Sequence, residues 1–283
     1  MAQAFETFFD IPYGPDSAQR QALDLYLPPG SNEASPLLVF VHGGGWRTEA
    51  KEDFRNDLMP AFVKATGLPT ACVEYRLAPQ YRHPTQALDS FAGLKRLVSS
   101  EPFACEQKTG PRWNRDELII AGHSVGAFIC LSLTLKPSSS DHPFSKLPLD
   151  VRDAVQGVVA IDGIYDLPSL LEEYPSYDSF VGSAFDLTPD VLERESPARW
   201  ELDDDRTNDS PLHVLVLHSR EDELLTLRQP EEFVKRFTSL QGVKKGKATL
   251  EVDYDTLKGT HDGVLRTDLL PRRVAEWAER VLI

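Results

Sequence analysis

Glu117-Leu-Ile-Ile-Ala-Gly-His-Ser124-Val-Gly-Ala-Phe-Ile-Cys-Leu131 is the stretch of sequence that decides the fold class of this chain. Residues 117–121 read as a short buried strand, and a Gly-x-Ser-x-Gly pattern follows at residues 122–126. The small residues that come next favour a helix. A sharp turn from strand to helix needs glycines on both sides of its serine, because a Cβ atom there would clash. We therefore expect Ser124 to stand exposed at the carboxyl edge of a sheet.

Short apolar runs recur along the rest of the chain and alternate with helical patterns. Unbroken apolar runs of this length are typical of parallel strands buried on both faces, and they occupy residues 37–41, 70–75, 155–161 and 212–217. Residues 248–254 alternate between apolar and polar, which predicts a more exposed strand. Residues 23–27 also alternate, and we expect an antiparallel edge strand there.

Apolar residues spaced by three and four predict helices between these strands. Such faces are formed by Ala87, Phe91, Leu94 and Val98, by Phe233, Phe237 and Leu240, and by Val274, Trp277 and Val281 in a helix that begins near Asp268. Alternating strands and helices predict a mostly parallel sheet with helices on both faces.

Residues 163–210 break this alternation and are rich in Tyr, Phe, Pro and acidic groups. Connections of that length usually act as lids or carry helices of their own. We expect one domain over residues 1–283 with a small lid-like insertion here, and we interpret residues 203–205 as a solvated turn.

Composition excludes several classes of protein. The 283 residues are 41% hydrophobic and 26% charged, which excludes a disordered chain and an integral membrane protein. The net charge of −14 disfavours nucleic acid and anionic membranes as partners. The first residues lack the pattern of a secretory signal and the three cysteines lie far apart, so we expect a cytoplasmic protein. The oligomeric state stays open, a homodimer included.

A second glycine-rich turn, His42-Gly-Gly-Gly-Trp46, follows the run at 37–41. Consecutive glycines let backbone N–H groups face one point, where a tetrahedral intermediate develops negative charge. A phosphate cradle is the rival interpretation, but the GxGxxG and GxxxxGK[ST] patterns are absent from the sequence. We interpret His42 as structural because it lies inside the turn.

A serine nucleophile needs a base, and the base needs a carboxylate that orients it. In a fold of this kind the acid and then the histidine each follow a later strand. His261 follows the run at 248–254, and Asp222 follows the run at 212–217. We expect no metal at His261, since no HExxH pattern or second histidine at ligand spacing accompanies it. Three further acids are rivals of Asp222: Glu221, Glu223 and Asp162.

Together these loops resemble the α/β-hydrolase superfamily. The HGGGW turn is similar to the HGGxW motif shared by hormone-sensitive-lipase-like esterases and kynurenine formamidases. Segments without a catalytic motif resemble the fungal kynurenine formamidases, namely residues 162–167, 173–178 and 218–229, as does GHSVGA at 122–127. The resemblance extends from about residue 37 to residue 277.

The resemblance implies an α/β-hydrolase fold and an enzyme that needs no cofactor. Its reaction would be the hydrolysis of N-formyl-L-kynurenine to L-kynurenine and formate, in tryptophan breakdown toward NAD. Ser124 would be the nucleophile, His261 the base and Asp222 the acid. Two or three backbone N–H groups would hold the oxyanion, from Gly44, Gly45 and Val125.

The aryl ring of such a substrate needs flat apolar walls, for which we consider Trp46 and Tyr165, with Tyr174 and Phe180 as further candidates. For each of these rings a place in the core is an equal alternative. Arg228 could meet the substrate carboxylate, and a structural ion pair is the alternative role for this side chain. A broad-specificity carboxylesterase of the hormone-sensitive-lipase-like group is the alternative function, because it would use the same catalytic residues. A binding module without activity is disfavoured, since both the serine and the histidine are present.

Overall fold

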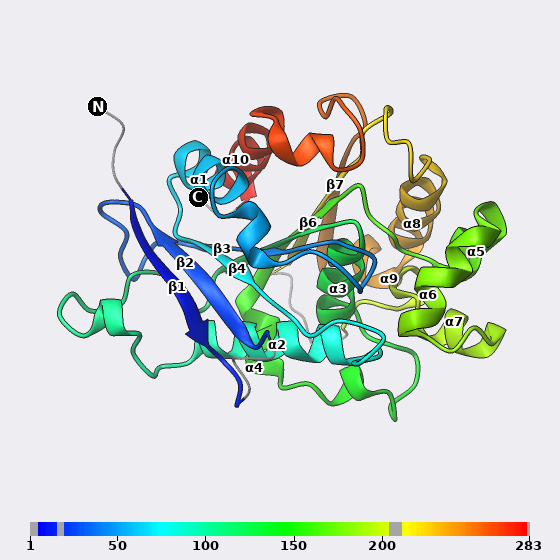
Figure 1. Ribbon diagram of the computed structural model, residues 1–283, viewed down its shortest axis with the longest axis horizontal. Coiled ribbons are helices and arrows are strands. Elements are labelled where there is room, and N and C mark those ends of the chain that lie inside the picture. Colours follow the sequence, from blue (N-terminus) through cyan, green and yellow to red (C-terminus); the bar gives the residue numbers. More distant parts are fainter. Residues whose placement is uncertain (1–4, 16–19, 204–210, 282–283) are drawn as a thin grey trace.

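One mixed sheet of eight strands crosses the computed structural model, which describes residues 5–15, 20–203 and 211–281 (Figure 1). The strands are Glu6–Pro12 (β1), Ala22–Leu27 (β2), Leu37–Val41 (β3), Thr70–Val73 (β4), Leu118–His123 (β5), Val155–Ile161 (β6), Leu212–Leu217 (β7) and Ala248–Asp253 (β8). Their order in the sheet is β1-β2-β4-β3-β5-β6-β7-β8. β2 pairs antiparallel with both β1 and β4, and the pairs from β4 to β8 are parallel.

The central strands are apolar at every position because both faces of the sheet are covered. Successive side chains of a strand point to opposite faces. In β3, Leu37, Val39 and Val41 belong to one apolar core, whereas Leu38 and Phe40 belong to the other. This double burial explains why the sequence shows continuous apolar runs instead of alternation.

Helices supply the other half of each core (Figure 1). α1 (Leu58–Thr66) and α10 (Leu269–Val281) pack on one face, while α2 (Thr85–Val98), α3 (Val125–Thr134) and α8 (Arg228–Ser239) pack on the other. The predicted sheet with helices on both faces is confirmed. Shorter α-helices are α4 (Leu149–Ala154), α5 (Leu167–Glu173), α6 (Asp178–Ala184), α7 (Pro189–Glu195) and α9 (Gln241–Lys244), and 3₁₀ turns span Lys51–Phe54, Ala104–Glu106, Pro143–Lys146, Pro175–Tyr177, Pro197–Arg199 and Gly263–Arg266.

The antiparallel edge of the sheet differs from the prediction. β2 is antiparallel as expected, but it lies one place inside the edge, and β1 is the edge strand. The side chains of β1 are mostly exposed, so neither an apolar run nor a regular alternation marks it in the sequence.

The segment between β6 and β7 contains α5, α6 and α7, which lie together at one end of the molecule (Figure 1). The expectation that it carries helices of its own is therefore confirmed for residues 163–203. Residues 204–210 of the predicted insertion, and with them most of the predicted solvated turn, lie outside the described residues. Its behaviour as a lid stays a prediction. In the described ranges, none of the helices has the length and apolarity to cross a membrane.

Candidate active site

Ser124 stands at the junction of β5 and α3 in a strained conformation. Its φ of 54° and ψ of −118° belong to a region that residues with a side chain rarely adopt. A Cβ atom on Gly126 would overlap the carbonyl oxygen of Val41, and one on Gly122 would overlap the backbone of Gly126. The turn therefore requires both glycines, for the steric reason that the sequence suggests.

Asp222 and His261 meet beyond the carboxyl ends of β7 and β8. His261 Nδ1 donates a hydrogen bond of 2.7 Å to Asp222 Oδ2. The other carboxylate oxygen, Oδ1, accepts the backbone N–H groups of Leu224 at 2.8 Å and Leu225 at 2.9 Å. Both side chains are buried. The imidazole is thus held in one orientation, with Nε2 as its remaining nitrogen.

Neighbouring charges set the protonation of this pair. Burial alone would raise the pKa of the Asp222 carboxyl, but the hydrogen bond and charge of His261 lower it below its ordinary value. Burial would lower the pKa of the His261 imidazole, but Asp222, with Asp162 and Asp262 nearby, raises it. The pairing thus favours the protonated imidazolium, the form that a base reaches when it takes a proton.

The raised pKa of His261 predicts the acid limb of the pH–rate profile. A base must be neutral, so kcat/KM should be full at high pH and fall as the pH drops through the pKa of His261. We expect the inflection above the ordinary value of 6.5. Steady-state kcat/KM measured from about pH 5 to about pH 9 tests this. An inflection clearly below 6.5 would contradict the pairing with Asp222.

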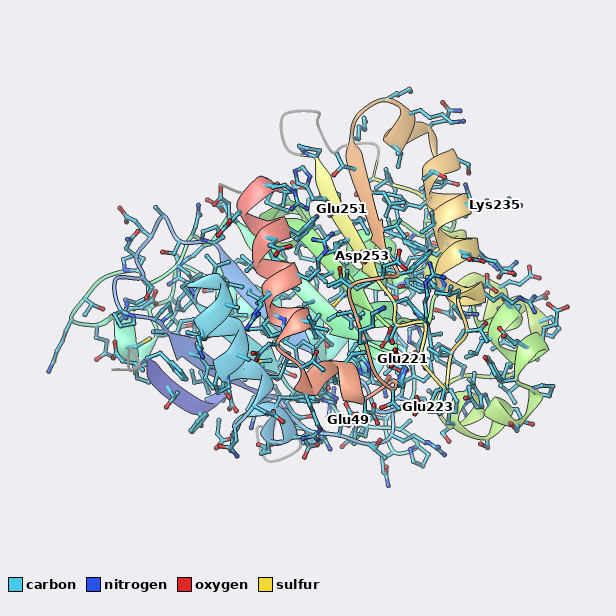
Figure 2. The ribbon with its side chains drawn as sticks, turned by 90° about the horizontal axis from the view of Figure 1, so that it is seen from above. Glu49, Glu221, Glu223, Lys235, Glu251 and Asp253 are labelled. Carbon is cyan, nitrogen blue, oxygen red and sulfur yellow. The ribbon has the colours of Figure 1, made fainter. Side chains whose placement is uncertain are left out.

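Two of the rival acids bind backbone N–H groups of the loop that contains His261. Glu223 Oε2 accepts the backbone N–H of His261 at 2.9 Å, and Glu221 Oε2 accepts that of Gly259 at 2.9 Å (Figure 2). Both carboxylates hold the backbone of the loop, whereas Asp222 holds the imidazole ring.

The third rival acid, Asp162, is fully buried behind the pair. Its Oδ1 accepts the backbone N–H of Ser219 at 2.7 Å, and burial raises its pKa to about 7. No hydrogen bond joins it to the ring of His261 within the described part of the chain, although its charge contributes to the pKa of that ring.

Ser124 and His261 share the wall of a cavity of about 330 Å³. Among the described residues no hydrogen bond joins the two side chains, and such contacts often tighten only when substrate binds. The remaining wall consists of the backbone turns of Gly44, Gly45 and Val125, the side chains of Ile164, Tyr177, Phe180, Leu224 and Leu225, the charged side chains of Arg47, Glu49 and Asp262, and Thr48.

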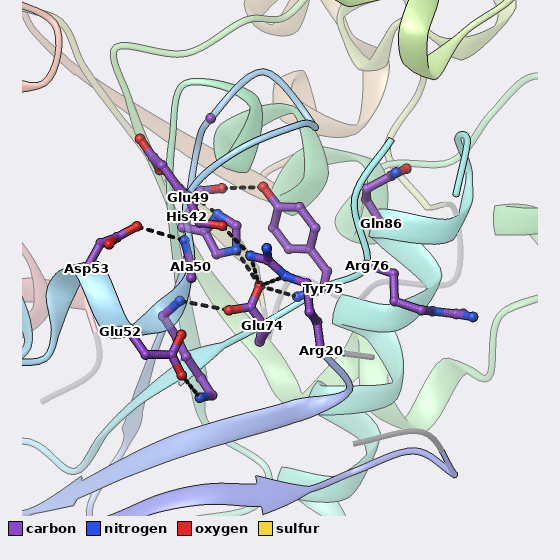
Figure 3. A network of polar contacts seen from close by, with 12 residues as sticks. Arg20, His42, Glu49, Ala50, Glu52, Asp53, Glu74, Tyr75, Arg76 and Gln86 are labelled. Carbon is purple, nitrogen blue, oxygen red and sulfur yellow. Dashed lines mark hydrogen bonds and ion pairs between the residues drawn. The ribbon is translucent and has the colours of Figure 1, made fainter. Parts of the chain in front are cut away.

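The glycine turn at residues 42–46 is held from behind by a polar network (Figure 3). His42 Nε2 donates to Glu74 Oε1 at 3.0 Å, and the His42 ring stacks on Tyr75 with 4.1 Å between ring centres. The hydroxyl of Tyr75 donates to the carbonyl of Gly43 at 2.7 Å, and the N–H of Gly43 donates to Glu49 Oε2 at 3.0 Å. These contacts give His42 the structural position that the sequence predicts.

In the described part of the chain, the next two backbone N–H groups of the turn donate no hydrogen bond. Gly44 and Gly45 have φ of 84° and 59°, and within the described residues no acceptor is recorded for either N–H. Val125 begins α3, where the first N–H groups of a helix have no partner inside the helix. Because all three residues border the cavity beside Ser124, their amides suit an oxyanion.

The structure places the predicted aromatic walls differently. Trp46 is fully buried and stacks behind Phe180, with 6.0 Å between ring centres. Tyr165 is also fully buried and stacks on Phe233 of α8 at 4.7 Å. Neither is among the described residues that line the cavity. Of the two roles considered for Trp46 and Tyr165, the structure shows the core, because both rings lie beneath the cavity wall. Phe180, a further candidate from the sequence, does line the cavity.

Of the two roles considered for Arg228, the structure shows the ion pair. Arg228 forms ion pairs with Glu172 and Glu232 on the outer surface, and it is not one of the described residues along the cavity. Tyr177 and Arg47 are among the cavity residues that the sequence analysis does not single out. Tyr177 falls within the segment 173–178 that resembles the formamidases, which is a signal that could have identified it.

Two overlapping groups of side chains have potential metal-ligand atoms within 4.8 Å of one another: His123, Asp162 and His261, and Asp162, His218 and Asp222. Some atoms of these side chains already have hydrogen-bond partners, whereas His123 Nδ1, Asp162 Oδ2 and His218 Nδ1 are buried without one in the described part of the chain. His123 Nε2 donates to the carbonyl of His261 at 3.0 Å, and Asp162 Oδ1 accepts from Ser219. We predict that dialysis against EDTA leaves turnover unchanged. Activity that disappears with EDTA and returns with zinc would contradict a serine mechanism without metal.

Comparison with known proteins identifies the family of this chain. The BD-FAE family profile matches residues 23–237. A kynurenine formamidase of Scheffersomyces stipitis is 32% identical over 285 residues, which cover 93% of this chain and 97% of that protein. A kynurenine formamidase of Eremothecium gossypii is 33% identical over 218 residues, 74% of this chain and 82% of that protein.

A solved structure, a truncated carbohydrate esterase from gut microbiota, superposes with a TM-score of 0.74 at 17% identity and covers 100% of this chain and 98% of its own. At that identity the likeness concerns the fold alone, which is the α/β-hydrolase fold. The sequence matches are more specific, and by them this chain belongs to the BD-FAE family of α/β-hydrolases and, within it, to the kynurenine formamidases.

Proposed function

We propose that this chain is a serine hydrolase that cleaves N-formyl-L-kynurenine to L-kynurenine and formate. One observation carries the proposal: a single cavity brings together a serine on a strained turn, a histidine bonded to a buried aspartate, and an aromatic wall. Kinship with the kynurenine formamidases supports the choice of substrate.

In the first half of the proposed reaction, Ser124 Oγ attacks the formyl carbon while His261 Nε2 takes the hydroxyl proton. The carbonyl oxygen becomes an oxyanion that accepts N–H groups of Gly44, Gly45 and Val125. His261 then gives its proton to the aniline nitrogen, the C–N bond breaks, and L-kynurenine leaves. Asp222 stabilises the imidazolium that exists between these proton transfers.

In the second half, a water molecule attacks the formyl ester on Ser124. His261 Nε2 takes a proton from this water and returns it to Ser124 Oγ as the ester bond breaks. The products are free enzyme and formic acid, which releases a proton to the solvent and becomes formate, so atoms and protons balance without a cofactor. Tyr177 and Phe180 would stack on the aryl ring while the formyl group lies at the glycine turn.

The proposed substrate predicts a strong preference for the smallest acyl group. Because a formyl carbon carries only hydrogen, the acyl side of the cavity can be narrow, and each added methylene should cost about one to two decades in rate. We expect kcat/KM to fall steeply from N-formyl- to N-acetyl- to N-butyrylkynurenine. A flat dependence on acyl length would contradict the formamidase proposal and favour the carboxylesterase.

The cellular setting forms part of the proposal. The net charge of −14 argues for a small-molecule substrate rather than nucleic acid or an anionic membrane, and we propose a cytoplasmic enzyme. A homodimer remains compatible with this proposal, as does a single domain with a lid formed around α5, α6 and α7.

A further inference from the structure

Arg47 differs from every other arginine in the described ranges. Each of the others has a hydrogen bond or an ion pair through its guanidinium, whereas Arg47 has neither. This is unexpected in a chain with 44 acidic and 30 basic residues. Arg47 is exposed and lines the cavity that holds Ser124. A guanidinium without a hydrogen bond or ion pair in such a place is available to an anionic ligand.

Distances to the Phe180 ring show where Arg47 lies relative to the glycine turn. A Cβ atom on Gly45 would lie 3.5 Å from Phe180 Cδ2, and the guanidinium carbon of Arg47 lies 5.8 Å from the centre of the same ring. The Phe180 ring thus lies against the glycine turn and also forms a cation–π contact with Arg47. An aryl substrate stacked here, with its formyl group at the turn, can present a substituent to Arg47.

We infer that Arg47 binds a carboxylate on the substituent of the aryl ring, which makes it a specificity-determining residue for N-formylated arylamines with an anionic side chain. The inference rests on the proposed function. A guanidinium offers two parallel N–H donors that match the two oxygens of a carboxylate. Arg47 therefore takes the role that the sequence suggests for Arg228.

The acidic side chains of the cavity restrict the substrate further. Glu49 and Asp262 border the same space, and burial together with the charge of Asp262 raises the pKa of Glu49. Two carboxylates disfavour a second negative charge and favour an ammonium group. An α-amino acid side chain supplies one carboxylate for Arg47 and one ammonium for these acids.

The role of Arg47 predicts a particular kinetic change. The carboxylate is remote from the bond that breaks, so Arg47 should hold the ground state and the transition state equally, and its loss should raise KM with little change in kcat. For Arg47→Met, we expect KM for N-formylkynurenine to rise about tenfold or more. Arg47→Lys keeps the charge but not the planar guanidinium. Its KM should therefore lie between those of the unmodified enzyme and of Arg47→Met.

Three substrates separate binding from structural damage. They are N-formyl-L-kynurenine, its analogue without the amino group (4-(2-formamidophenyl)-4-oxobutanoate), and the neutral N-(2-acetylphenyl)formamide, which has neither charge. Arg47→Met should raise KM for the two carboxylates several times more than for the neutral ketone. Arg228→Met is the matched control, because it removes an arginine that does not line the cavity, and it should leave all three KM values unchanged.

An equal rise in KM for all three substrates would mean that Arg47 only maintains the shape of the glycine turn. This result would overturn the inference. Unchanged KM values would overturn it as well. If the unmodified enzyme hydrolyses N-formylkynurenine well in either case, the proposed function survives. An unmodified enzyme that cleaves simple esters but not N-formylkynurenine would overturn the proposed function, and the inference with it.

Discussion

Replacing Ser124 by alanine should lower kcat for N-formylkynurenine by about 10⁴-fold to 10⁶-fold. Without the hydroxyl no formyl ester can form, and only the weak catalysis of the oxyanion amides remains. The fold should survive, because alanine keeps the Cβ atom and loses a single buried hydroxyl. Release of kynurenine, followed by its absorbance, measures the loss. An unchanged thermal melting curve would show that the variant is folded.

Labelling adds an independent measure of the same prediction. A fluorophosphonate should modify the unmodified enzyme at Ser124 and leave Ser124→Ala unlabelled, because only an activated serine reacts readily. If the unmodified chain resists the reagent and Ser124→Ala keeps its activity, the nucleophile lies elsewhere. If neither chain has any activity, the binding-module hypothesis gains support.

Asp222→Asn should lower kcat by up to about 10⁴-fold while the fold persists. An amide can still accept from the backbone N–H groups of Leu224 and Leu225, but it favours the wrong tautomer of His261 and carries no charge to stabilise the imidazolium. Steady-state kinetics on N-formylkynurenine measures the effect.

Two neighbouring carboxylates provide controls for Asp222. In Glu223→Gln the side-chain oxygen can still accept the backbone N–H of His261, so the loss should be small. Asp162→Asn should also cost far less than Asp222→Asn, since Asp162 contacts the backbone of Ser219 rather than the imidazole. A larger loss in Asp162→Asn than in Asp222→Asn would move the catalytic acid to Asp162.

Burial explains which parts of the fold the sequence predicts. β3 and β6 coincide with their predicted ranges because strands covered on both faces are apolar throughout. β1 is an exposed edge held by its pairing with β2, so its side chains carry no pattern. Pairing across a sheet edge depends on backbone hydrogen bonds, to which any residue type contributes.

The site shows the same division between local pattern and tertiary contact. The strained turn at Ser124 is local, and its glycines mark it in the sequence. Sequence order places an acid near residue 222, but three consecutive carboxylates stand there, and only the tertiary contact with His261 distinguishes Asp222. Trp46 and Arg47 are adjacent, yet one enters the core and the other borders the cavity, a difference that composition does not encode.

The central claim is that the cavity around Ser124 serves an N-formyl arylamide. The most direct test is the ratio of kcat/KM for N-formyl-L-kynurenine to that for p-nitrophenyl butyrate, measured on one enzyme preparation with Ser124→Ala as the blank. We predict that N-formylkynurenine is strongly preferred and that Ser124→Ala loses both activities. Preference for the butyrate ester would contradict the claim and identify the chain as a carboxylesterase.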